Sequence, residues 1–337
     1  MLQVALAIAA FAGVAEALRR RRAACAAGAA APPPPQAPPA AGAASTLAAK
    51  RRALVAGGPS ALHLILDYDR TMTSFIGPDG RRGDTCHGTV ERRRSEELRA
   101  RAEALASVFY PIEVDPLRSR ESKVPLMETW YMLVNEILVA AGMTRRDLRE
   151  DVAAANLRLR PGIVAALDWA ARHDVPVTVF SAGIGDVIEE VLRQRYRAQP
   201  HAKLRVVSNS MVWDGEGDDA KVIGFSAPVL HPFNKFAGAV LSELPYFAEL
   251  RARPHVLLLG DSPGDAVMAE GLDAAHVLRV GFLNDNVEQL RAKYEQLFDI
   301  VVTHDGGAGC VTELLEEIDA AGAEAAAAGG AAAKPTR

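Results

Sequence analysis

Residues 62–71 read LHLILDYDRT, a short apolar run that passes directly into two aspartates, Asp67 and Asp69. An apolar run of this length is typical of a strand buried on both faces of a parallel sheet. Side chains two residues apart on an extended chain point to the same side, so both carboxylates can act on one ligand at the end of the strand. Taken alone, this pattern fits an ordinary polar turn equally well.

Five later apolar runs are similar in length, and amphipathic stretches separate them. The expected strands are Leu62–Leu66, Val175–Phe180, Leu204–Ser208, His255–Leu259, Leu278–Leu283 and Asp299–Thr303. The expected helices are Pro161–Arg172, Gly185–Arg195, Gly264–Gly271, Val287–Leu297 and Ala308–Ala320. This alternation predicts an α/β fold in which a parallel sheet is the middle of three layers and helices cover both of its faces.

The long segment 75–159, between the first and second expected strands, shows helical patterns and no convincing buried strand. We expect helices over Thr89–Ser107 and Val124–Ala141, forming a helical cap over the carboxyl end of the sheet, where open α/β folds bind ligands. The charge run Glu91–Arg94 is interpreted as a solvated helix face without a function. A smaller insertion, Asn209–Val229, contains turn-forming residues and is expected to be a β-hairpin.

The overall composition is that of an ordinary soluble protein, with a net charge of −4 and 24% charged residues. Without a basic excess, binding to a nucleic-acid polymer is not expected, whereas monomeric nucleotides remain open as ligands. The cysteines Cys25, Cys86 and Cys310 show no paired spacing, so neither a disulfide framework nor a zinc site is supported and a reducing compartment fits best.

Both ends of the chain differ in composition from its middle. Leu2–Leu18 is apolar and four arginines follow it, a pattern that fits a membrane anchor, for example in the endoplasmic reticulum, an organelle transit peptide or a low-complexity leader. We otherwise expect a monomer whose catalytic part lies in the cytoplasm. The predicted division is an Ala/Pro/Arg-rich leader (1–60), a catalytic core (61–74 and 160–319), a helical cap domain (75–159) and a disordered Ala/Gly tail (320–337).

The second expected strand ends in small residues. Residues 179–186 read VFSAGIGD, in which Ser181 can donate its hydroxyl group. The backbone amides of Ala182 and Gly183, near a helix start, can bind phosphate oxygens. An ordinary strand-to-helix loop explains the same residues equally well.

A further strand ends in acidic residues. Residues 258–265 read LLGDSPGD and place Asp261 and Asp265 after an apolar run, while Lys235 begins a helical stretch from which it can reach a phosphate. Because the carboxyl ends of parallel strands meet at one edge, four carboxylates would gather there. Such a cluster requires a hard cation, and Mg²⁺ held by a few carboxylates and a substrate phosphate satisfies it.

The order of these stretches resembles the four motifs of the haloacid dehalogenase superfamily, which implies a Rossmann-like core with a cap inserted after the first strand. More narrowly, the chain resembles the cytosolic pyrimidine 5′-nucleotidase family from about Leu62 to Glu316, and its terminal segments are not covered. The stretches that carry the resemblance are IEVDP (112–116), FSAGIGD (180–186), FNK (233–235), LLGDSPGD (258–265) and GFLND (281–285).

The resemblance implies a Mg²⁺-dependent hydrolysis of nucleoside 5′-monophosphates through an aspartyl-phosphate. Asp67 would be the nucleophile, and Asp69 would protonate the leaving 5′-oxygen and then activate water. The side chain of Asp67, the backbone carbonyl of Asp69 and Asp261 would bind Mg²⁺, with Asp265 supporting them from behind. The groups implied to hold the phosphate oxygens are the Ser181 hydroxyl, the Ala182 amide and the Lys235 ammonium.

Glu113 lies in an apolar stretch of the expected cap. The matching glutamate of the family binds the nucleobase, so the resemblance implies that role here. The alternative is a salt bridge inside the cap with an arginine such as Arg118 or Arg120.

Base preference is left open by a departure from the family pattern. Val134 stands where relatives have a serine that contacts some substrates, particularly methylated purine nucleotides. CMP, UMP and 7-methyl-GMP therefore all remain expected substrates. The neighbouring Trp130 and Tyr131 fit either stacking on a base or packing within the cap.

Three other activities share parts of this pattern. A phosphoserine phosphatase would use the same catalytic groups with a cap that reads an amino-acid head group, and a non-catalytic nucleotide-binding protein would need no nucleophile. Transfer of phosphate to a second nucleoside would use every residue that hydrolysis uses.

Overall fold

The computed structural model describes residues 46–332 except 116, 197–200 and 241–245. The leader up to residue 45, with the expected anchor or transit segment Leu2–Leu18, therefore lies outside the described residues. Within the described part, no helix combines the length and apolarity needed to cross a bilayer.

A six-stranded parallel sheet forms the middle of the fold, in the order β3-β2-β1-β6-β7-β8. From β1 the chain adds β2 and β3 on one side, and β6, β7 and β8 on the other side. The point between β1 and β6 is therefore a topological switch point, and ligands bind outside the carboxyl ends of the strands at such a point. The strands are β1 (Leu62–Leu66), β2 (Val177–Ile184), β3 (Leu204–Asn209), β6 (His255–Gly260), β7 (His276–Leu283) and β8 (Ile300–Thr303). Each expected strand is confirmed, with ends that shift by a few residues.

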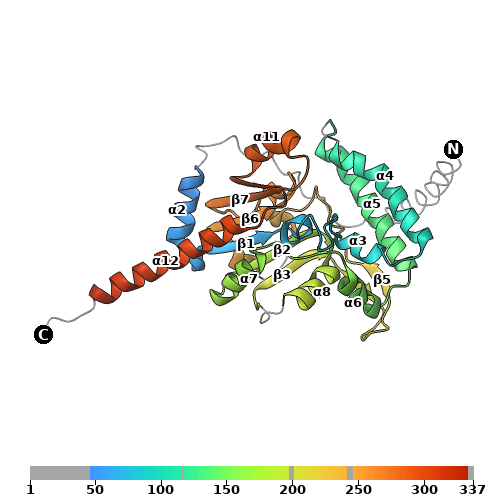
Figure 1. Cartoon of the computed structure of the whole chain (residues 1–337), viewed down its shortest axis with the longest axis horizontal. Helices are drawn as coiled ribbons and strands as arrows, with labels where there is room; N and C mark the ends of the chain where they lie inside the picture. Colours follow the sequence, from blue (N-terminus) through green and yellow to red (C-terminus); the bar gives the residue numbers. More distant parts are fainter. Residues whose placement is uncertain (1–45, 116, 197–200, 241–245, 333–337) are drawn as a thin grey trace. The chain divides into compact units, whose positions relative to one another are not determined.

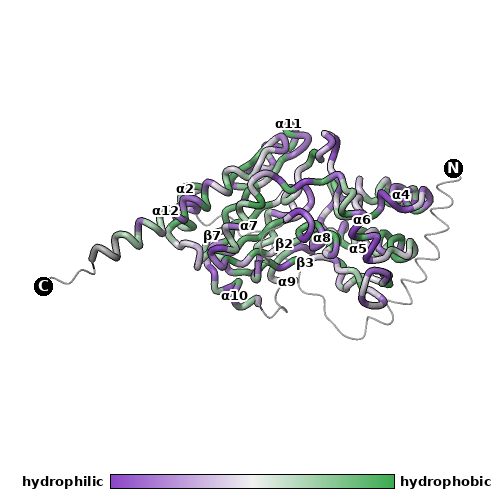
Figure 2. The backbone as a smooth tube through the Cα atoms, turned by 60° about the horizontal axis from the view of Figure 1, so that its bottom comes forward, coloured by the Kyte–Doolittle hydropathy of each residue, from purple (hydrophilic) through white to green (hydrophobic). Residues whose placement is uncertain are grey.

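Helices cover both faces of this sheet (Figure 1). The side chains of β1 alternate between two hydrophobic clusters: Leu64 packs with residues of α7 and α12, while Ile65 packs with residues of α10 and α11. Figure 2 shows hydrophobic residues gathered along the strands. The predicted three-layer arrangement is thus confirmed. The helices are α2 (Leu47–Gly57), α7 (Ile163–Arg172), α8 (Gly185–Arg195), α9 (Ala237–Val240), α10 (Phe247–Arg251), α11 (Val287–Leu297) and α12 (Gly309–Ala332).

Helical structure extends beyond both predicted limits of the folded part, residues 61 and 319. Helix α2 falls within the expected leader, yet its Leu54 is fully buried in the core and Lys50 pairs with Asp299 at 2.7 Å. The expected disordered tail is helical as far as Ala332, because its alanines have the highest intrinsic helix propensity. Composition alone did not reveal that these low-complexity segments form helices.

The helix expected over Gly264–Gly271 was also wrong, since only the 3₁₀ turn Asp265–Val267 forms there. The Asp265 side chain accepts hydrogen bonds from the backbone of Asp261 and Ser262, which offers this backbone an alternative to a helix.

The insertion between β1 and β2 is helical, as expected. It contains α3 (Cys86–Glu91), α4 (Glu96–Val114), α5 (Arg120–Ala140) and α6 (Arg145–Ala154). The long helices begin where Ser95 and Ser119 cap them, which shifts both from their expected ranges. The expected hairpin is confirmed as β4 (Met211–Trp213) paired with β5 (Val222–Phe225). The division into a core and a cap domain stays a prediction.

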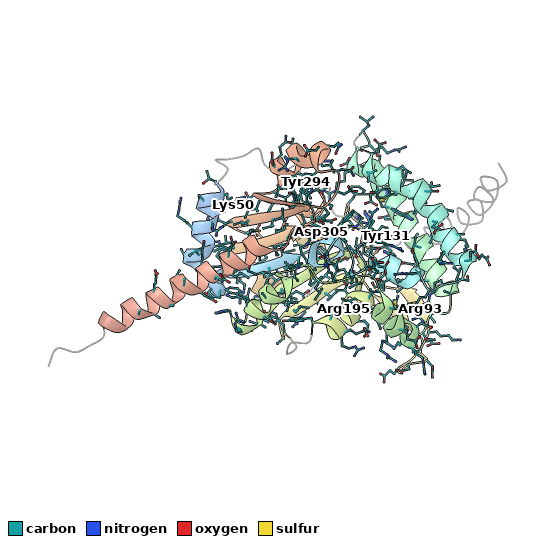
Figure 3. All side chains as sticks on the ribbon, viewed as in Figure 1. Lys50, Arg93, Tyr131, Arg195, Tyr294 and Asp305 are labelled. Carbon is teal, nitrogen blue, oxygen red and sulfur yellow. The ribbon has the colours of Figure 1, made fainter. Side chains whose placement is uncertain are left out.

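Two chain segments connect the insertion to the sheet, and they lie side by side. Thr73 pairs with Leu159 in an antiparallel bridge. The Asp305 carboxylate, from the loop after β8, accepts hydrogen bonds from the backbone amides of Phe75 and Ile76 at 2.7 and 3.0 Å. Figure 3 shows Asp305 on the side of the sheet that faces α4 and α5.

Arg160 is completely buried where these segments cross. Its guanidinium donates hydrogen bonds to the carbonyl oxygens of Thr71 (2.8 Å) and Gly306 (2.6 Å) and lies 3.2 Å from Asp305. It also lies over the Phe282 ring, 4.2 Å from the ring centroid. A single side chain therefore ties the loop after β1 to the ends of β7 and β8.

Replacement of this arginine should strongly destabilise the fold. Arg160→Leu removes one partner of a buried ion pair and leaves several carbonyl oxygens unsatisfied, so we expect the free energy of unfolding to fall by about 3–5 kcal/mol. Urea unfolding followed by circular dichroism measures this. Arg158→Leu is the matched control, because Arg158 is exposed, and its effect should stay within about 0.5 kcal/mol. Equal effects of the two substitutions would contradict this role for Arg160.

Candidate active site

Three carboxylates meet at the switch point of the sheet. Asp67 directly follows β1, Asp261 directly follows the neighbouring β6, and Asp265 lies in the next turn. Each offers an oxygen, and these oxygens all lie within 4.8 Å of one another. Hard oxygen ligands at this spacing suit Mg²⁺.

Lys235 is the cation that contacts this cluster. Its Nζ atom lies 2.6 Å from Oδ1 of Asp67 and 2.7 Å from Oδ1 of Asp265, and all three side chains are buried. Burial lowers the pKa of Lys235, but the attraction of the two carboxylates outweighs it and holds the pKa above its usual value. The lysine therefore stays charged.

One lysine does not balance three carboxylates, of which Asp67 and Asp265 are buried and Asp261 is half-buried. Burial raises the pKa of Asp67 to about 7, against the attraction of Lys235, and repulsion from Asp265 adds to it. Burial, followed by repulsion from Asp67 and Asp265, raises the pKa of Asp261 as well. Since Asp67 and Asp261 are costly to ionise here, the residues present fit a divalent cation that these two carboxylates would share with Asp265.

The two carboxylate oxygens of Asp265 have different partners. Oδ1 pairs with Lys235, whereas Oδ2 accepts hydrogen bonds from the amide of Asp261 (3.1 Å) and from the amide and hydroxyl of Ser262 (2.9 and 2.8 Å). The turn closes so tightly that a Cβ atom on Gly260 would lie 2.3 Å from the Cβ of Asp265. Asp265 thus holds the loop that carries Asp261.

Asp69 contacts the helical insertion. Its Oδ1 accepts a hydrogen bond from the amide of Cys86, the first residue of α3, at 2.9 Å. Burial raises the pKa of Asp69, and the bond from Cys86 partly opposes this. Helix α3 can come this close because residue 183 is a glycine, where a Cβ atom would lie 2.7 Å from the Cys86 sulfur.

Ser181 and Ala182 lie at the end of β2, next to β1 in the sheet, and Ser181 is buried. The Ser181 hydroxyl oxygen accepts a hydrogen bond from the Gly183 amide at 3.0 Å, which leaves the hydroxyl hydrogen to be donated. The Gly183 amide was expected to be free to bind phosphate oxygens, and this is wrong because it already donates to Ser181. Asn209 fixes this loop by donating to the carbonyl oxygen of Ala182 at 2.8 Å.

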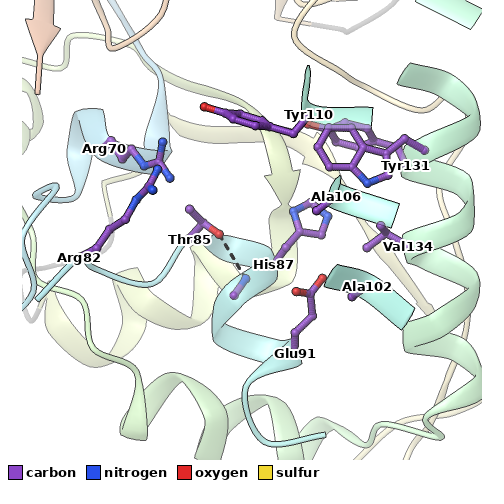
Figure 4. Close-up of a pocket in the computed structure, with 12 residues that line it drawn as sticks. Arg70, Arg82, Thr85, His87, Glu91, Ala102, Ala106, Tyr110, Tyr131 and Val134 are labelled. Atoms are coloured by element: carbon purple, nitrogen blue, oxygen red, sulfur yellow. Dashed lines mark hydrogen bonds between the residues drawn. The ribbon is translucent and has the colours of Figure 1, made fainter. Parts of the chain in front are cut away.

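A pocket of about 410 Å³ opens between the loop after β1 and the insertion (Figure 4). Its lining includes Trp130, Tyr131 and Val134, the three residues that the sequence connects with base preference or stacking on a base. Trp130 also stacks on Phe109, with 6.0 Å between ring centroids, so it both packs within the insertion and faces the pocket. The other lining residues are Arg70, Arg82, Thr85, His87, Gly88, Glu91, Ala102, Ala106 and Tyr110.

Several of these lining residues were missed. Glu91 was interpreted as part of a solvated helix face, which is wrong, because its side chain faces the pocket from the end of α3. The sequence held one usable signal for this element: Thr85 accepts a hydrogen bond from the Gly88 amide, so it caps a helix that starts earlier than the expected Thr89.

Glu113 lies near the end of α4 and is half-buried, outside the residues that line the pocket. Burial raises its pKa to about 7, and Lys123 only partly opposes this. The alternative salt bridge was wrong: Arg118 pairs with Asp115 at 3.4 Å and Arg120 donates to a backbone carbonyl oxygen, and across residues 46–332 as described neither pairs with Glu113.

Comparison with known proteins identifies similar sequences over most of the chain. A family model for pyrimidine 5′-nucleotidase (UMPH-1) matches residues 70–319. The 7-methylguanosine phosphate-specific 5′-nucleotidase of Gallus gallus is 37% identical over 269 residues, which are 79% of this chain and 91% of that protein. A putative cytosolic 5′-nucleotidase 3 of Caenorhabditis elegans is 30% identical over 272 residues, or 79% of this chain and 71% of that protein.

A solved structure has a similar fold. Cytosolic 5′-nucleotidase IIIB bound to cytidine superposes with a TM-score of 0.68 and 29% sequence identity, covering 80% of this chain and 90% of that one.

The raised pKa of Glu113 predicts a pH dependence of stability. A carboxyl group whose pKa is 4.5 in the unfolded chain and about 7 in the folded protein binds more protons when folded. Its contribution to stability is therefore full below about pH 4.5 and is lost as the pH rises toward about 7. Urea midpoints of Glu113→Gln should fall less over this range than those of the wild type.

The exposed Glu97 on the same helix provides the control for this comparison. Glu97→Gln should leave the pH dependence of the urea midpoint unchanged. The same pH slope in wild type and Glu113→Gln would show that Glu113 ionises normally in the folded protein.

Proposed function

The chain belongs to the pyrimidine 5′-nucleotidase family, within the haloacid dehalogenase superfamily, and on that premise we propose that it hydrolyses nucleoside 5′-monophosphates to nucleoside and phosphate. The observation that carries this proposal is the buried contact of Lys235 with Asp67 beside Asp261, at the edge of the sheet where the pocket opens. Relatives named for 7-methylguanosine phosphate, and a similar structure bound to cytidine, support a nucleoside as the leaving group.

In the proposed reaction, a carboxylate oxygen of Asp67 attacks the phosphorus atom and the bond to the 5′-oxygen breaks. The nucleoside leaves with a proton from Asp69, and an aspartyl-phosphate remains on Asp67. Asp69 then takes a proton from a water molecule, which attacks the same phosphorus atom. Phosphate is released and both aspartates return to their starting states.

Asp69 suits the acid and base steps because of its surroundings. Burial raises its pKa, so the carboxyl group can hold a proton before the first step. The bond from the Cys86 amide fixes the orientation of the carboxyl group. Since Cys86 belongs to the insertion, this orientation depends on the insertion being packed on the sheet.

We propose that the side chains of Asp67 and Asp261 and the backbone carbonyl of Asp69 hold Mg²⁺, with Asp265 positioning Asp261. Bound there, Mg²⁺ would neutralise charge on the phosphate oxygens. The proposed phosphate donors are the Ser181 hydroxyl, the Ala182 amide and the Lys235 ammonium.

We propose that the pocket receives the nucleoside, with Trp130 as a stacking surface. Val134 is an apolar part of the wall where the family has a serine, so base recognition here relies on other polar groups. The family resemblance implies a contact between Glu113 and the base, and we propose this contact although Glu113 is not among the lining residues. The proposed substrates are 7-methyl-GMP, CMP and UMP. Because one relative is named as cytosolic, we also propose a cytoplasmic site of action.

Phosphate release from a substrate panel tests the function. With Mg²⁺ present, we expect the purified chain to prefer 7-methyl-GMP, CMP or UMP over phosphoserine, and we expect a chelator to abolish turnover. Asp67→Asn should lower kcat by at least about 1000-fold, since an amide of the same size is not a nucleophile. Preference for phosphoserine, or turnover by Asp67→Asn, would contradict the proposal.

Substitution of Glu113 tests base recognition separately. Glu113→Ala should lower kcat/KM for nucleotides by about 10-fold or more, because a hydrogen bond to a charged group is lost, but should leave hydrolysis of a base-free aryl phosphate nearly normal. Steady-state kinetics on both substrates measures this split. An equal loss on both would rule out a contact between Glu113 and the base.

A further inference from the structure

The pocket carries opposite charges on its two sides (Figure 4). Arg70 and Arg82 lie on one side, and Glu91 lies on the other, beyond His87. Arg70 directly follows Asp69 in the loop after β1, so the positive side adjoins the proposed catalytic centre. A nucleotide with its phosphate near this loop would direct its base toward the negative side.

Glu91 is a carboxylate without a counter-ion. It is half-buried, and none of the described residues forms a hydrogen bond or an ion pair with its side chain. The nearby arginines are already paired, Arg92 with Asp84 at 3.0 Å and Arg94 with Asp151. Burial, with a smaller effect of the exposed Glu103, raises the pKa of Glu91 to about 7. A ligand can therefore supply the hydrogen-bond donor that this carboxylate lacks.

The surroundings of Glu91 leave space for a flat ligand with both donors and acceptors. Gly88, Ala102 and Ala106 line the same pocket with little or no side chain, and Ala102 lies beside Glu91 in Figure 4. Trp130 lines the same pocket, and its indole N–H is buried without a hydrogen-bond partner. The pocket thus offers acceptor oxygens from the Glu91 carboxylate and an unused donor from the Trp130 ring.

A 2-amino-6-oxopurine matches this set of groups. Its N1–H and 2-amino group lie side by side and can donate to both oxygens of one carboxylate, and its 6-oxo group is an acceptor. Cytosine and adenine present a single amino group on the corresponding edge. Methylation at N7 adds a positive charge to the ring, which a half-buried carboxylate would further favour.

We propose that Glu91 is a specificity-determining residue, whose carboxylate accepts hydrogen bonds from the N–H groups of a guanine-type base at the end of the pocket remote from the phosphate. This inference rests on the proposed nucleotidase function and names the substrate class of the same site. It assigns to α3 a base contact additional to the one proposed for Glu113.

The test compares Glu91→Gln with Glu103→Gln. Glu103 is an exposed residue of α4 outside the pocket lining, so its substitution is the matched control. The values of kcat/KM for GMP, 7-methyl-GMP, CMP and ribose 5-phosphate are measured for both variants and the wild type. In Glu91→Gln, the ratio of GMP or 7-methyl-GMP to ribose 5-phosphate should fall by about 10-fold to 100-fold, mainly through KM, as expected for lost hydrogen bonds to a charged group. Glu103→Gln should keep the wild-type ratio.

A second variant probes the same end of the pocket without changing its charge. Ala106→Leu adds volume to the pocket lining and should lower the same ratio. Calorimetric titration with 7-methylguanosine should show weaker binding to both pocket variants, independently of turnover. The melting temperature of Glu91→Gln should equal or exceed that of the wild type, because an unpaired, half-buried carboxylate is removed.

An unchanged ratio in Glu91→Gln, or an equal loss on nucleotides and ribose 5-phosphate, would overturn the assignment of Glu91. Failure of the nucleotidase function itself would already be visible in the wild type, as hydrolysis of ribose 5-phosphate without hydrolysis of any nucleotide.

Discussion

The contact of the Lys235 ammonium with the carboxylates of Asp67 and Asp265 is the constraint on which the site depends. Burial makes Asp67 and Asp261 costly to ionise, and one lysine cannot balance the negative charge of Asp67, Asp261 and Asp265 together. The sheet nevertheless brings them together, because β1 and β6 are neighbours whose carboxyl ends form the switch point. This concentrated negative charge is unfavourable for stability and favourable for a site that binds a divalent cation and a phosphate.

The helical insertion contributes to the site in addition to covering it. Cys86, at the start of α3, donates to the proposed acid Asp69, and Gly183 leaves the space for that approach. On the opposite side of the loop, Arg160 and Asp305 bind the backbone of the segments that lead into the insertion. The same packing therefore orients the proposed catalytic carboxyl group and closes one wall of the pocket that receives the proposed nucleoside.

Much of this arrangement could be predicted from the sequence, because buried parallel strands are short apolar runs and their polar groups follow at one edge. The position of Asp67 and Asp261 follows from that rule alone. Arg160 could not be predicted, since its partners are carbonyl oxygens and Asp305, which are distant in sequence. Glu91 stands in a charge run that resembles an exposed helix face, and only the packing of α3 against α4 turns it toward the pocket. Similarly, the low-complexity composition around α2 did not reveal that this helix packs on the sheet, and the composition after residue 320 did not reveal that the expected helix α12 continues to Ala332.

The central claim is that Asp67 becomes phosphorylated during turnover. Rapid acid quenching of the Mg²⁺-loaded enzyme after mixing with a nucleoside monophosphate labelled with ³²P, followed by peptide mapping, measures this directly, because an acyl phosphate survives acid. The account predicts label on the peptide that contains Asp67, and no labelled protein when that residue is asparagine. Label on a different peptide, or turnover without any labelled protein, would contradict it.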